Sequence, residues 1–320
     1  MKIGFYNDFR PCVLKGDGVV DISREIRSLE GGSPQLTLEN IIVNFQFLRP
    51  KFERILERGK VIPFSDIRLR APVPRPGKVI NGRANFMEGV PTVPPRPLAT
   101  FFKSPDAVIG PGDAIVLPTF HPVIFHHEAE LCCVIGQTAR DVSVAQALDY
   151  VFGYTTGVDV SARTPIEGEA PLAGEYGKSF DTFLPIGPAI TTTEEIRDPN
   201  NLSVKYWVNG QLRQDYNTSD MEHNVAYFIA AVSAVMTLKP GDLIMCGTNH
   251  QGLGPLQDGD EAVIEIEGVG RSSNYVVDSL KRTWPQGIDP QVGRNIKERR
   301  TAMNGTPSAG TWPLTPPRTN

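Results

Sequence analysis

Residues 125–136 read FHHEAELCCVIG, and the second half, LCCVIG, is a short apolar run that ends at a glycine. A run of this length and composition is typical of a buried β-strand. Side chains on a strand alternate between its two faces, so Glu128 and Glu130 would point to the same side, about 7 Å apart along the chain. The segment therefore predicts a strand that carries two carboxylates on one face.

Two neighbouring carboxylates repel each other, and burying both is costly unless a positive charge compensates. A divalent cation would supply that charge, because Mg²⁺, Mn²⁺ and Ca²⁺ prefer oxygen ligands. The alternative is an exposed strand face with two hydrated glutamates. The pair by itself does not decide between a cation site and a solvated surface.

The chain from about residue 79 to residue 284 has mainly the pattern of β-strands. Asn209-Gly210, inside YWVNGQL, is a strong signal for a two-residue type I′ hairpin. In the stretch EAVIEI at 261–266, the apolar residues Ala262, Ile264 and Ile266 recur at every second position, as on the buried face of a strand. We therefore predict an α+β fold that is mainly β.

One helix is marked in this region. Ser219 and Glu222 have the spacing of a capping box, and apolar residues follow at helical intervals as far as Met236. Pro240-Gly241 would end the helix.

Residues 1–70 are expected to form a small, separate α+β unit. Thr37 would cap a helix, Pro50 would end or kink it, and Phe52 would begin a second helical face. The basic, proline-rich stretch IRLRAPVPRPGK then predicts a linker. Residues 71–284 would form the main domain, and residues 285–320, rich in Pro, Gly, Asn, Thr and Arg, would form an extended or disordered tail.

The bulk composition narrows the function classes. The chain has 320 residues, 40% of them hydrophobic, and a formal net charge of −4, so neither a nucleic acid nor a membrane surface is an expected partner. No apolar run approaches the ~20 residues of a membrane-spanning helix, and the N-terminus lacks an apolar signal core. We therefore expect a cytoplasmic protein. Its four cysteines, without a C-x-x-C spacing, favour small buried hydrophobes over a zinc or redox site.

Several segments match part of a known catalytic motif but lack a required residue. HHEAEL has Leu131 where a zinc protease needs its second histidine, and GEYGKSF has Leu172 where a phosphate-binding loop needs its first glycine. There is no G-x-S-x-G elbow. These failures leave carboxylate–metal chemistry as the main option.

Two further segments offer site residues. In GYTTGVDVSAR, Asp159 is a candidate third ligand, and Arg163 is a candidate for binding a substrate carboxylate. In YGKSFDTF, Lys178 would neutralise an enolate or bind a carboxylate if it is partly buried. The alternatives are a turn aspartate that caps the backbone and a surface lysine beside Asp181.

Taken in order, these and other segments between about residues 70 and 277 resemble the fumarylacetoacetate hydrolase superfamily. The segments that carry the resemblance are PVPRPGKVINGRANF, FFKSPDAVIGPGDAIVLP, HHEAELCCVIG, YVFGYTTGVDVSAR, GKSFDTFLPIGP, VNGQLRQDYNTSDM, LKPGDLIMCGTNHQGLG and GDEAVIEIEGVG. The resemblance implies a mixed β-sandwich or β-roll catalytic domain, usually in a homodimer, with Mg²⁺ or Mn²⁺ bound and Ca²⁺ as an alternative. Residues 1–70 resemble the small N-terminal domain of bacterial members more loosely.

The resemblance also assigns site residues. It implies that the metal ligands are Glu128, Glu130 and Asp159, and that the family's lysine is Lys178. The residues implied to bind substrate are Arg163, Lys103, Gly247 and Thr248.

The chain departs from the family pattern in the segment that supplies the catalytic base. Hydrolytic members usually carry a His-Glu pair after an Asn-Tyr motif, and these two positions are Gly89 and Thr92 here. Ile166 replaces a glutamine, and Asn249-His250 replace a proline after the substrate loop. Glu88 and His250 are the candidate replacements for the base, against the alternative that neither is catalytic.

We expect residues 85–97 to form a mobile lid, because its glycine and prolines disfavour a long helix. The expected function is metal-dependent hydrolysis of a C–C bond in a small 1,3-dioxo or 2-oxo acid of the acylpyruvate type. The alternatives are a 2-oxo acid decarboxylase, a tautomerase or isomerase, a hydratase, and a catalytically silent cation-binding protein. Specificity would depend on loop residues such as Glu167, Glu169 and Tyr176.

Overall fold

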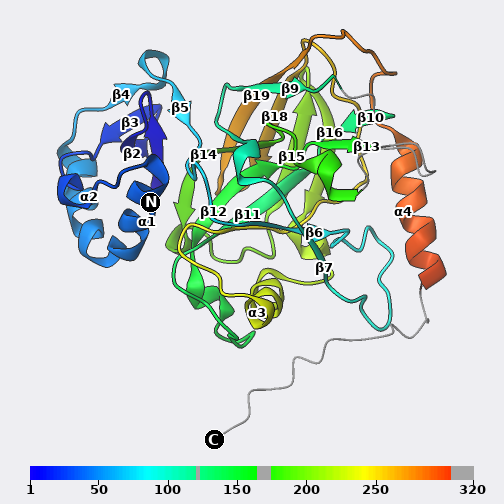
Figure 1. Cartoon of the computed structure of the whole chain (residues 1–320), viewed down its shortest axis with the longest axis horizontal. Helices are drawn as coiled ribbons and strands as arrows, with labels where there is room; N and C mark the ends of the chain where they lie inside the picture. Colours follow the sequence, from blue (N-terminus) through cyan, green and yellow to red (C-terminus); the bar gives the residue numbers. More distant parts are fainter. Residues whose placement is uncertain (120–122, 164–173, 304–320) are drawn as a thin grey trace, which may run out of the picture.

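The computed structural model describes residues 1–119, 123–163 and 174–303. The fold is mainly β, as predicted, and the described part of the chain contains four α-helices. Figure 1 shows two packed sheets in the main body, with the N-terminal strands and helices at one end and the last helix at the other. The helices are α1 (Pro34–Val43), α2 (Phe45–Arg58), α3 (Val225–Val235) and α4 (Pro290–Met303).

The larger sheet has 12 strands. Its main path runs in the order β4-β3-β2-β1-β14-β12-β11-β17-β6-β7, while β5 pairs with β1 and β8 with β14. The β17–β6 and β14–β8 pairs are parallel, and the others are antiparallel. The strands are β1 (Lys2–Tyr6), β2 (Arg10–Lys15), β3 (Gly18–Asp21), β4 (Ile62–Pro63), β5 (Leu69–Arg70), β6 (Val79–Arg83), β7 (Ala99–Phe102), β8 (Val108–Ile109), β11 (Ala129–Ile135), β12 (Val151–Val158), β14 (Leu184–Thr192) and β17 (Leu243–Met245).

The second sheet has five strands in the order β16-β15-β18-β19-β9, and a separate two-stranded ribbon joins β10 to β13. The inner face of the five-stranded sheet packs on the larger sheet, so that Tyr206 and Ile264 share one hydrophobic core with Cys133 and Tyr154. The strands are β9 (Ala114–Leu117), β10 (Ile124–His126), β13 (Ser161–Arg163), β15 (Ser203–Val208), β16 (Gln211–Asn217), β18 (Glu261–Ile266) and β19 (Gly270–Asp278).

Two local predictions in this sheet are confirmed. β15 and β16 form a hairpin through Asn209 and Gly210, whose φ angles of 52° and 75° are those of a type I′ turn. On β18, Ala262, Ile264 and Ile266 are all buried, as the alternation predicted.

The N-terminal unit is less separate than the sequence suggested. Its strand β1 pairs with β14 of the main body, with Ile3 opposite Ile190, so that the sheet continues from one region into the other. Ile3 and Phe52 also share a hydrophobic core with Cys132 and Leu184. Short sequence patterns do not reveal this pairing because its two strands are far apart in the chain.

Two predictions about the N-terminal helices are wrong. The cap of α1 is Ser33, whose hydroxyl accepts a hydrogen bond from the Leu36 N–H, and Pro34 follows it in the favoured first position. Thr37 lies inside the helix. Pro50 neither ends nor borders a helix but lies within α2, on its exposed side. Water can satisfy the carbonyl that Pro50 leaves without a donor, while Phe52 anchors the buried side.

The predicted start of α3 is also wrong. Asn224 caps the helix and accepts from the Tyr227 N–H at 2.9 Å, whereas Ser219 lies in the preceding 3-10 turn. The proposed capping box fails because the carboxylate of Glu222 binds Arg96 and Arg300 instead. These partners are distant in sequence, so the local pattern was misleading.

Residues 290–303 correct the expectation of an extended or disordered tail, because they form α4. The side chain of Arg300 explains why this polar segment is ordered. It is completely buried and donates hydrogen bonds to the carbonyls of Phe86 and Val90 and to Glu222. Residues 304–320 lie outside the described part of the chain.

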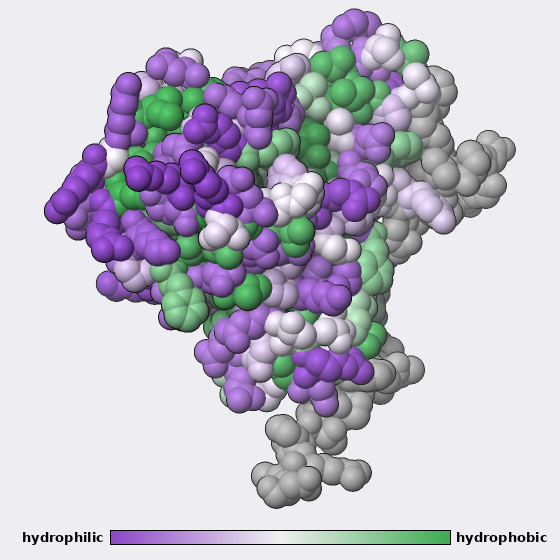
Figure 2. Space-filling view, turned by 60° about the vertical axis from the view of Figure 1, so that its left-hand side comes forward, coloured by the Kyte–Doolittle hydropathy of each residue, from purple (hydrophilic) through white to green (hydrophobic). Residues whose placement is uncertain are grey.

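The surface and core agree with the composition. Figure 2 shows a face on which hydrophilic residues predominate and hydrophobic residues gather in small groups. Among the described residues, no helix has the length and apolar character needed to cross a membrane. All four cysteines are buried and free, and Cys132 and Cys133 enter different hydrophobic cores on opposite faces of β11.

Candidate metal centre

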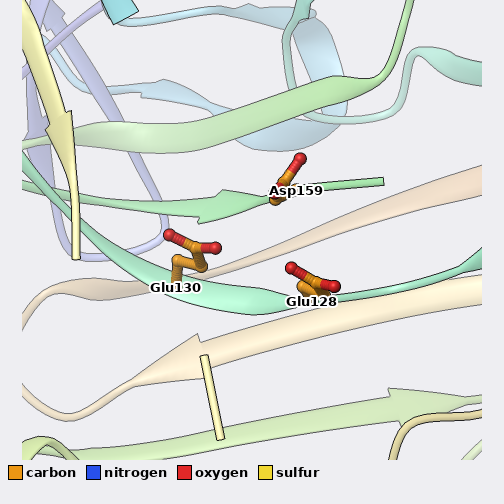
Figure 3. A group of neighbouring side chains, drawn as sticks. All are labelled: Glu128, Glu130 and Asp159. Atoms are coloured by element: carbon orange, nitrogen blue, oxygen red, sulfur yellow. The ribbon is translucent and has the colours of Figure 1, made fainter. Parts of the chain in front are cut away.

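The three predicted ligands converge. Each of Glu128, Glu130 and Asp159 offers a carboxylate oxygen, and these oxygens lie within 4.8 Å of one another. Figure 3 shows the three as neighbouring side chains, with Glu128 and Glu130 on one segment and Asp159 just beyond the end of the adjacent strand. Glu128 precedes β11 and Asp159 follows the paired strand β12, so the antiparallel register places them side by side, and the Asp159 N–H donates to the Glu128 carbonyl at 2.8 Å. All three residues are at most 5% exposed, which rules out the alternative of a solvated strand face.

The electrostatics of this cluster call for added positive charge. Burial raises the pKa of Glu130 well above its usual range, and the carboxylates of Asp159 and Glu128 raise it further. The ligand set consists of hard oxygen atoms without sulfur or imidazole, which suits Mg²⁺, Mn²⁺ or Ca²⁺. The residues present therefore fit a divalent cation.

Lys178 is a close partner of the cluster. Its ammonium group donates to Glu128 at 2.9 Å, to the Ser161 hydroxyl at 2.8 Å and to Asp159. Burial alone would lower the pKa of Lys178, but the charges of Asp159 and Glu128 outweigh it and raise the pKa. The lysine is thus held in its charged form beside the carboxylates, and the alternative of a surface lysine paired with Asp181 is not realised.

A cavity of about 360 Å³ opens on the cluster. Its polar lining includes Arg83, Glu128, Ser161, Arg163, Lys178 and His250. Arg163 donates to the Glu128 carboxylate and, at 3.2 Å, to His126 Nδ1. Burial alone would raise the pKa of Glu128, but Lys178 and Arg163 hold it well below the usual range. A larger cavity, of about 510 Å³, lies between the 94–98 loop and α3, away from these charges. We therefore take the smaller cavity as the candidate substrate site.

Lys103 occupies a different place from the one expected. Its ammonium group is completely buried and donates to Asp159 at 2.6 Å and to the carbonyls of Val160 and Lys178. These three acceptors use all three of its hydrogens, and Lys103 does not line the candidate substrate site. In the structure Lys103 thus holds Asp159 from behind the cavity, and direct binding of substrate by Lys103 stays a prediction.

Gly247 and Thr248 also lie behind the carboxylates. The Gly247 N–H donates to Glu130 at 2.8 Å, with a φ of 86° that favours glycine. The Thr248 hydroxyl accepts from Gln214 at 2.8 Å. Neither residue lines the candidate substrate site, and the loop contacts the candidate ligand Glu130 instead.

Glu88 and His250, the two candidate replacements for the base, face each other and form a hydrogen-bonded pair. Glu88 Oε1 lies 2.5 Å from His250 Nδ1 and accepts the His250 backbone N–H at 3.2 Å. Gln251 donates to the other oxygen of Glu88 at 2.6 Å. His250 lines the candidate substrate site, whereas Glu88 does not.

The backbone around Glu88 is unusual. Glu88 and Gly89 have φ angles of 55° and 75°, and the Val90 N–H donates to the Met87 carbonyl at 2.9 Å, which makes a tight turn. A positive φ is uncommon for glutamate and costs conformational energy. The turn aims the carboxylate at the 250 loop, while Thr92 donates its hydroxyl to Glu222 instead of entering the site.

Sequence reasoning missed several neighbours of the site. Ser161, two residues after Asp159 on the next strand, was recoverable from alternation. Ile296 and Arg299 of α4 were not recoverable, because the tail was expected to lack a helix. Tyr176 is 69% exposed and does not line the candidate substrate site. The proposed specificity residues Glu167 and Glu169, like Ile166, lie outside the described part of the chain.

Comparison with known proteins now identifies the family. Residues 80–277 match the family described as fumarylacetoacetate (FAA) hydrolase, C-terminal. The chain belongs to the fumarylacetoacetate hydrolase family. A maleylpyruvate hydrolase of Aquipseudomonas alcaligenes is 32% identical over 84% of this chain and 97% of its own length. A mitochondrial oxaloacetate tautomerase of Bos taurus is 35% identical over 82% of this chain and 85% of its own length.

Solved structures agree on the family. Maleylpyruvate hydrolase from Sphingobium sp. SYK-6, in complex with manganese(II) and pyruvate, superposes with a TM-score of 0.78 at 35% identity, over 87% of this chain and 99% of that chain. The family thus includes hydrolases and tautomerases, and its relatives support an enzyme. The manganese(II) complex of a relative and the acidic cluster of this chain together support a metal-binding site.

Proposed function

We propose that this chain is a divalent-metal-dependent hydrolase that cleaves a C–C bond in a small 1,3-dioxo or 2-oxo acid of the acylpyruvate type. The observation that carries the proposal is the Glu88–His250 pair. It restores a candidate base at the cavity beside the buried carboxylates, although the usual histidine and glutamate positions hold Gly89 and Thr92.

Glu128, Glu130 and Asp159 would hold Mg²⁺ or Mn²⁺, with Ca²⁺ as an alternative. When bound, such an ion supplies Lewis-acid chemistry to a chelated oxo acid. Arg163 lines the same cavity and would orient the substrate carboxylate. Lys103 and Gly247 would keep Asp159 and Glu130 in place through the hydrogen bonds described above.

His250 is the better candidate for the base, although Glu88 is adjacent in the chain to Gly89, which occupies the usual histidine position. The carboxylate of Glu88 is buried, and its oxygens accept from His250 and Gln251. With Nδ1–H directed at Glu88, the imidazole keeps Nε2 to accept a proton from water, and Glu88 stabilises the imidazolium that results. Glu88 is then a positioning residue.

In the hydrolytic step, the oxygen of the activated water adds to the carbonyl carbon remote from the carboxylate. The C–C bond between that carbon and the pyruvyl unit then breaks, and its electron pair passes to the enolate of pyruvate. Lys178 and Arg163 supply positive charge beside this developing anion. The enolate takes up a proton, so that the products are a carboxylic acid and pyruvate.

Tautomerisation is the second candidate. It needs a proton acceptor and donor at the same cavity but no attack by water, so His250 would serve it equally well. The similarity to an oxaloacetate tautomerase supports tautomerisation as the second candidate function. Decarboxylation, other isomerisation and hydration need the same oxo-acid site, and the silent cation-binding protein remains the outcome if no oxo acid reacts.

The test is to incubate the purified, Mn²⁺- or Mg²⁺-loaded protein with 2,4-dioxo acids in ¹⁸O-labelled water. Hydrolysis predicts pyruvate together with a carboxylic acid that carries the label. Deuterium exchange at C3 in heavy water without cleavage products would overturn hydrolysis in favour of tautomerisation. Glu128→Ala should abolish either reaction, which excludes a contaminating activity.

We also propose, from family resemblance, that the protein is a cytoplasmic homodimer. Many short strands leave sheet edges that benefit from cover. Light scattering at micromolar concentration should give twice the 35.1 kDa mass of the chain. A mass of 35.1 kDa would contradict the dimer.

A further inference from the structure

Helix α4 lies outside residues 80–277, the part of the chain that matches the family, yet it completes the candidate substrate site. Ile296 and Arg299 line the same cavity as Glu128, Lys178 and His250. Figure 1 shows α4 beside β10 and β13, near the loop that leaves β6. The C-terminal helix is therefore placed to act on substrate specificity.

Buried contacts fix the position of α4. Arg300 donates to the carbonyls of Val90 and Phe86 at 2.8 and 3.0 Å, and its side chain also reaches Glu222 at 3.1 Å. About two turns earlier, the Gly293 carbonyl accepts a hydrogen bond from Gln251, which also binds Glu88. These contacts on both sides of Ile296 hold the helix against the loops that carry the Glu88–His250 pair.

The charge around the cavity is strongly asymmetric. Among the residues that the structure describes, Glu128 is the one acidic residue in its lining, and this carboxylate is already engaged by Lys178 and Arg163. Arg83 and Arg299 add two more cations to the lining. Arg299 is exposed, and it forms no ion pair with any residue that the structure describes. A guanidinium at the wall of a substrate cavity that has no acidic partner in the described part of the chain is suited to bind a carboxylate of the ligand.

We propose that Arg299 is a specificity-determining residue that binds a second carboxylate of the substrate, so that the preferred substrates are dicarboxylic oxo acids. The inference rests on the proposed function, because the 2-oxo acid end of the substrate would be bound by Arg163 and by the cation that the carboxylate cluster would hold. Ile296 supplies an apolar wall for the carbon chain between the two ends. The cavity of about 360 Å³ lies in the size range of small-molecule sites.

The test compares Arg299→Gln with Lys297→Gln, which removes an equal charge from the same helix at a residue that does not line the cavity. Each variant and the wild type are loaded with Mn²⁺. Calorimetry then measures binding of two chain-length-matched pairs, 2-oxoglutarate with 2-oxopentanoate and 2-oxoadipate with 2-oxohexanoate. Turnover is measured for a 2,4-dioxo acid with a terminal carboxylate and for its methyl-terminated analogue.

Arg299→Gln should weaken the binding of at least one dicarboxylic acid by about 10–100-fold and lower kcat/KM for the dicarboxylic substrate by a similar factor. This is the usual contribution of charge-assisted hydrogen bonds. Binding and turnover of the monoacids should stay within about twofold, and Lys297→Gln should match the wild type. Equal losses for diacids and monoacids, or no loss, would overturn the role of Arg299. If the wild type turns over no dioxo acid, the proposed function fails, while the binding comparison still decides the role of Arg299.

Discussion

Glu88 and His250 lie 162 residues apart in the chain, yet Glu88 Oε1 and His250 Nδ1 are 2.5 Å apart. Burial alone would raise the pKa of Glu88, but the hydrogen bonds that its carboxylate accepts from His250 and Gln251 outweigh burial and lower it. The carboxylate is thus ready to support a positive charge on the imidazole. The proposed base and the residue that positions it come from two different loops, which the fold brings together.

The first prediction separates the two members of this pair. His250→Asn should lower kcat by about 10²–10⁴-fold, the usual contribution of a general base. Glu88→Gln keeps the shape but removes the charge, so its loss should be smaller. The double variant should resemble His250→Asn, because Glu88 acts through the imidazole. Steady-state kinetics on an active 2,4-dioxo acid provide the measurement, and a double variant with wild-type kcat would show that neither residue serves the reaction.

The second prediction concerns Lys178, which contacts two of the three carboxylates. Lys178→Met in the metal-loaded protein should lower kcat by orders of magnitude with little change in Tm. The metal would still compensate the carboxylates, but the charge beside the developing enolate would be lost. Kinetics and thermal melting are to be run on the same preparation. A large fall in Tm with normal kcat would instead make Lys178 a structural residue.

The third prediction uses Gly247, whose N–H binds Glu130. An added Cβ would lie 3.1 Å from both Asn85 Cβ and the Gly82 carbonyl, at a φ of 86°. Gly247→Ala should therefore displace the loop and weaken binding of Mn²⁺, measured by calorimetry. Gly16→Ala is the matched control, because Gly16 has a φ of 60° with no atom within 4 Å of the added Cβ. Equal metal affinity in both variants would contradict a role for this loop in holding Glu130.

The fourth prediction concerns how the contribution of Glu222 to the free energy of unfolding changes with pH. Burial would raise its pKa, but hydrogen bonds from Arg300, Thr92 and Arg96 outweigh burial and lower the pKa to about 2 from 4.5. The unfolded chain binds the proton more readily, so this contribution is complete above about pH 4.5 and is lost as the pH falls toward 2.

Glu222→Gln should thus lower the free energy of unfolding at pH 7 by about 1–3 kcal/mol, with solvent screening of the ion pairs taken into account. The difference from the wild type should shrink below pH 4.5. Urea unfolding at several pH values provides the measurement, with Glu57→Gln on the exposed side of α2 as the control. A deficit that stays constant down to pH 2 would mean that the charge of Glu222 is not what stabilises this junction.

Local patterns in the sequence determined much of the candidate metal centre. Alternation along residues 125–136 placed Glu128 and Glu130 on one face, and the turn chemistry of Asn209-Gly210 determined the β15–β16 hairpin. Both rest on periods and dihedral preferences that act over a few residues. Local segments made Asp159 and Lys178 candidates, the family resemblance assigned them to the site, and the structure brings both to the same cluster.

Tertiary structure decided what depends on partners far along the chain. Glu222 has the spacing of a capping residue, but Arg300 and Arg96 take its carboxylate, so α3 begins at Asn224 instead. The polar segment of α4 becomes a wall of the cavity because Arg300 finds buried acceptors in the 86–90 loop. A charged side chain can be buried only where its partners converge, and that convergence is a property of the folded chain rather than of any single segment.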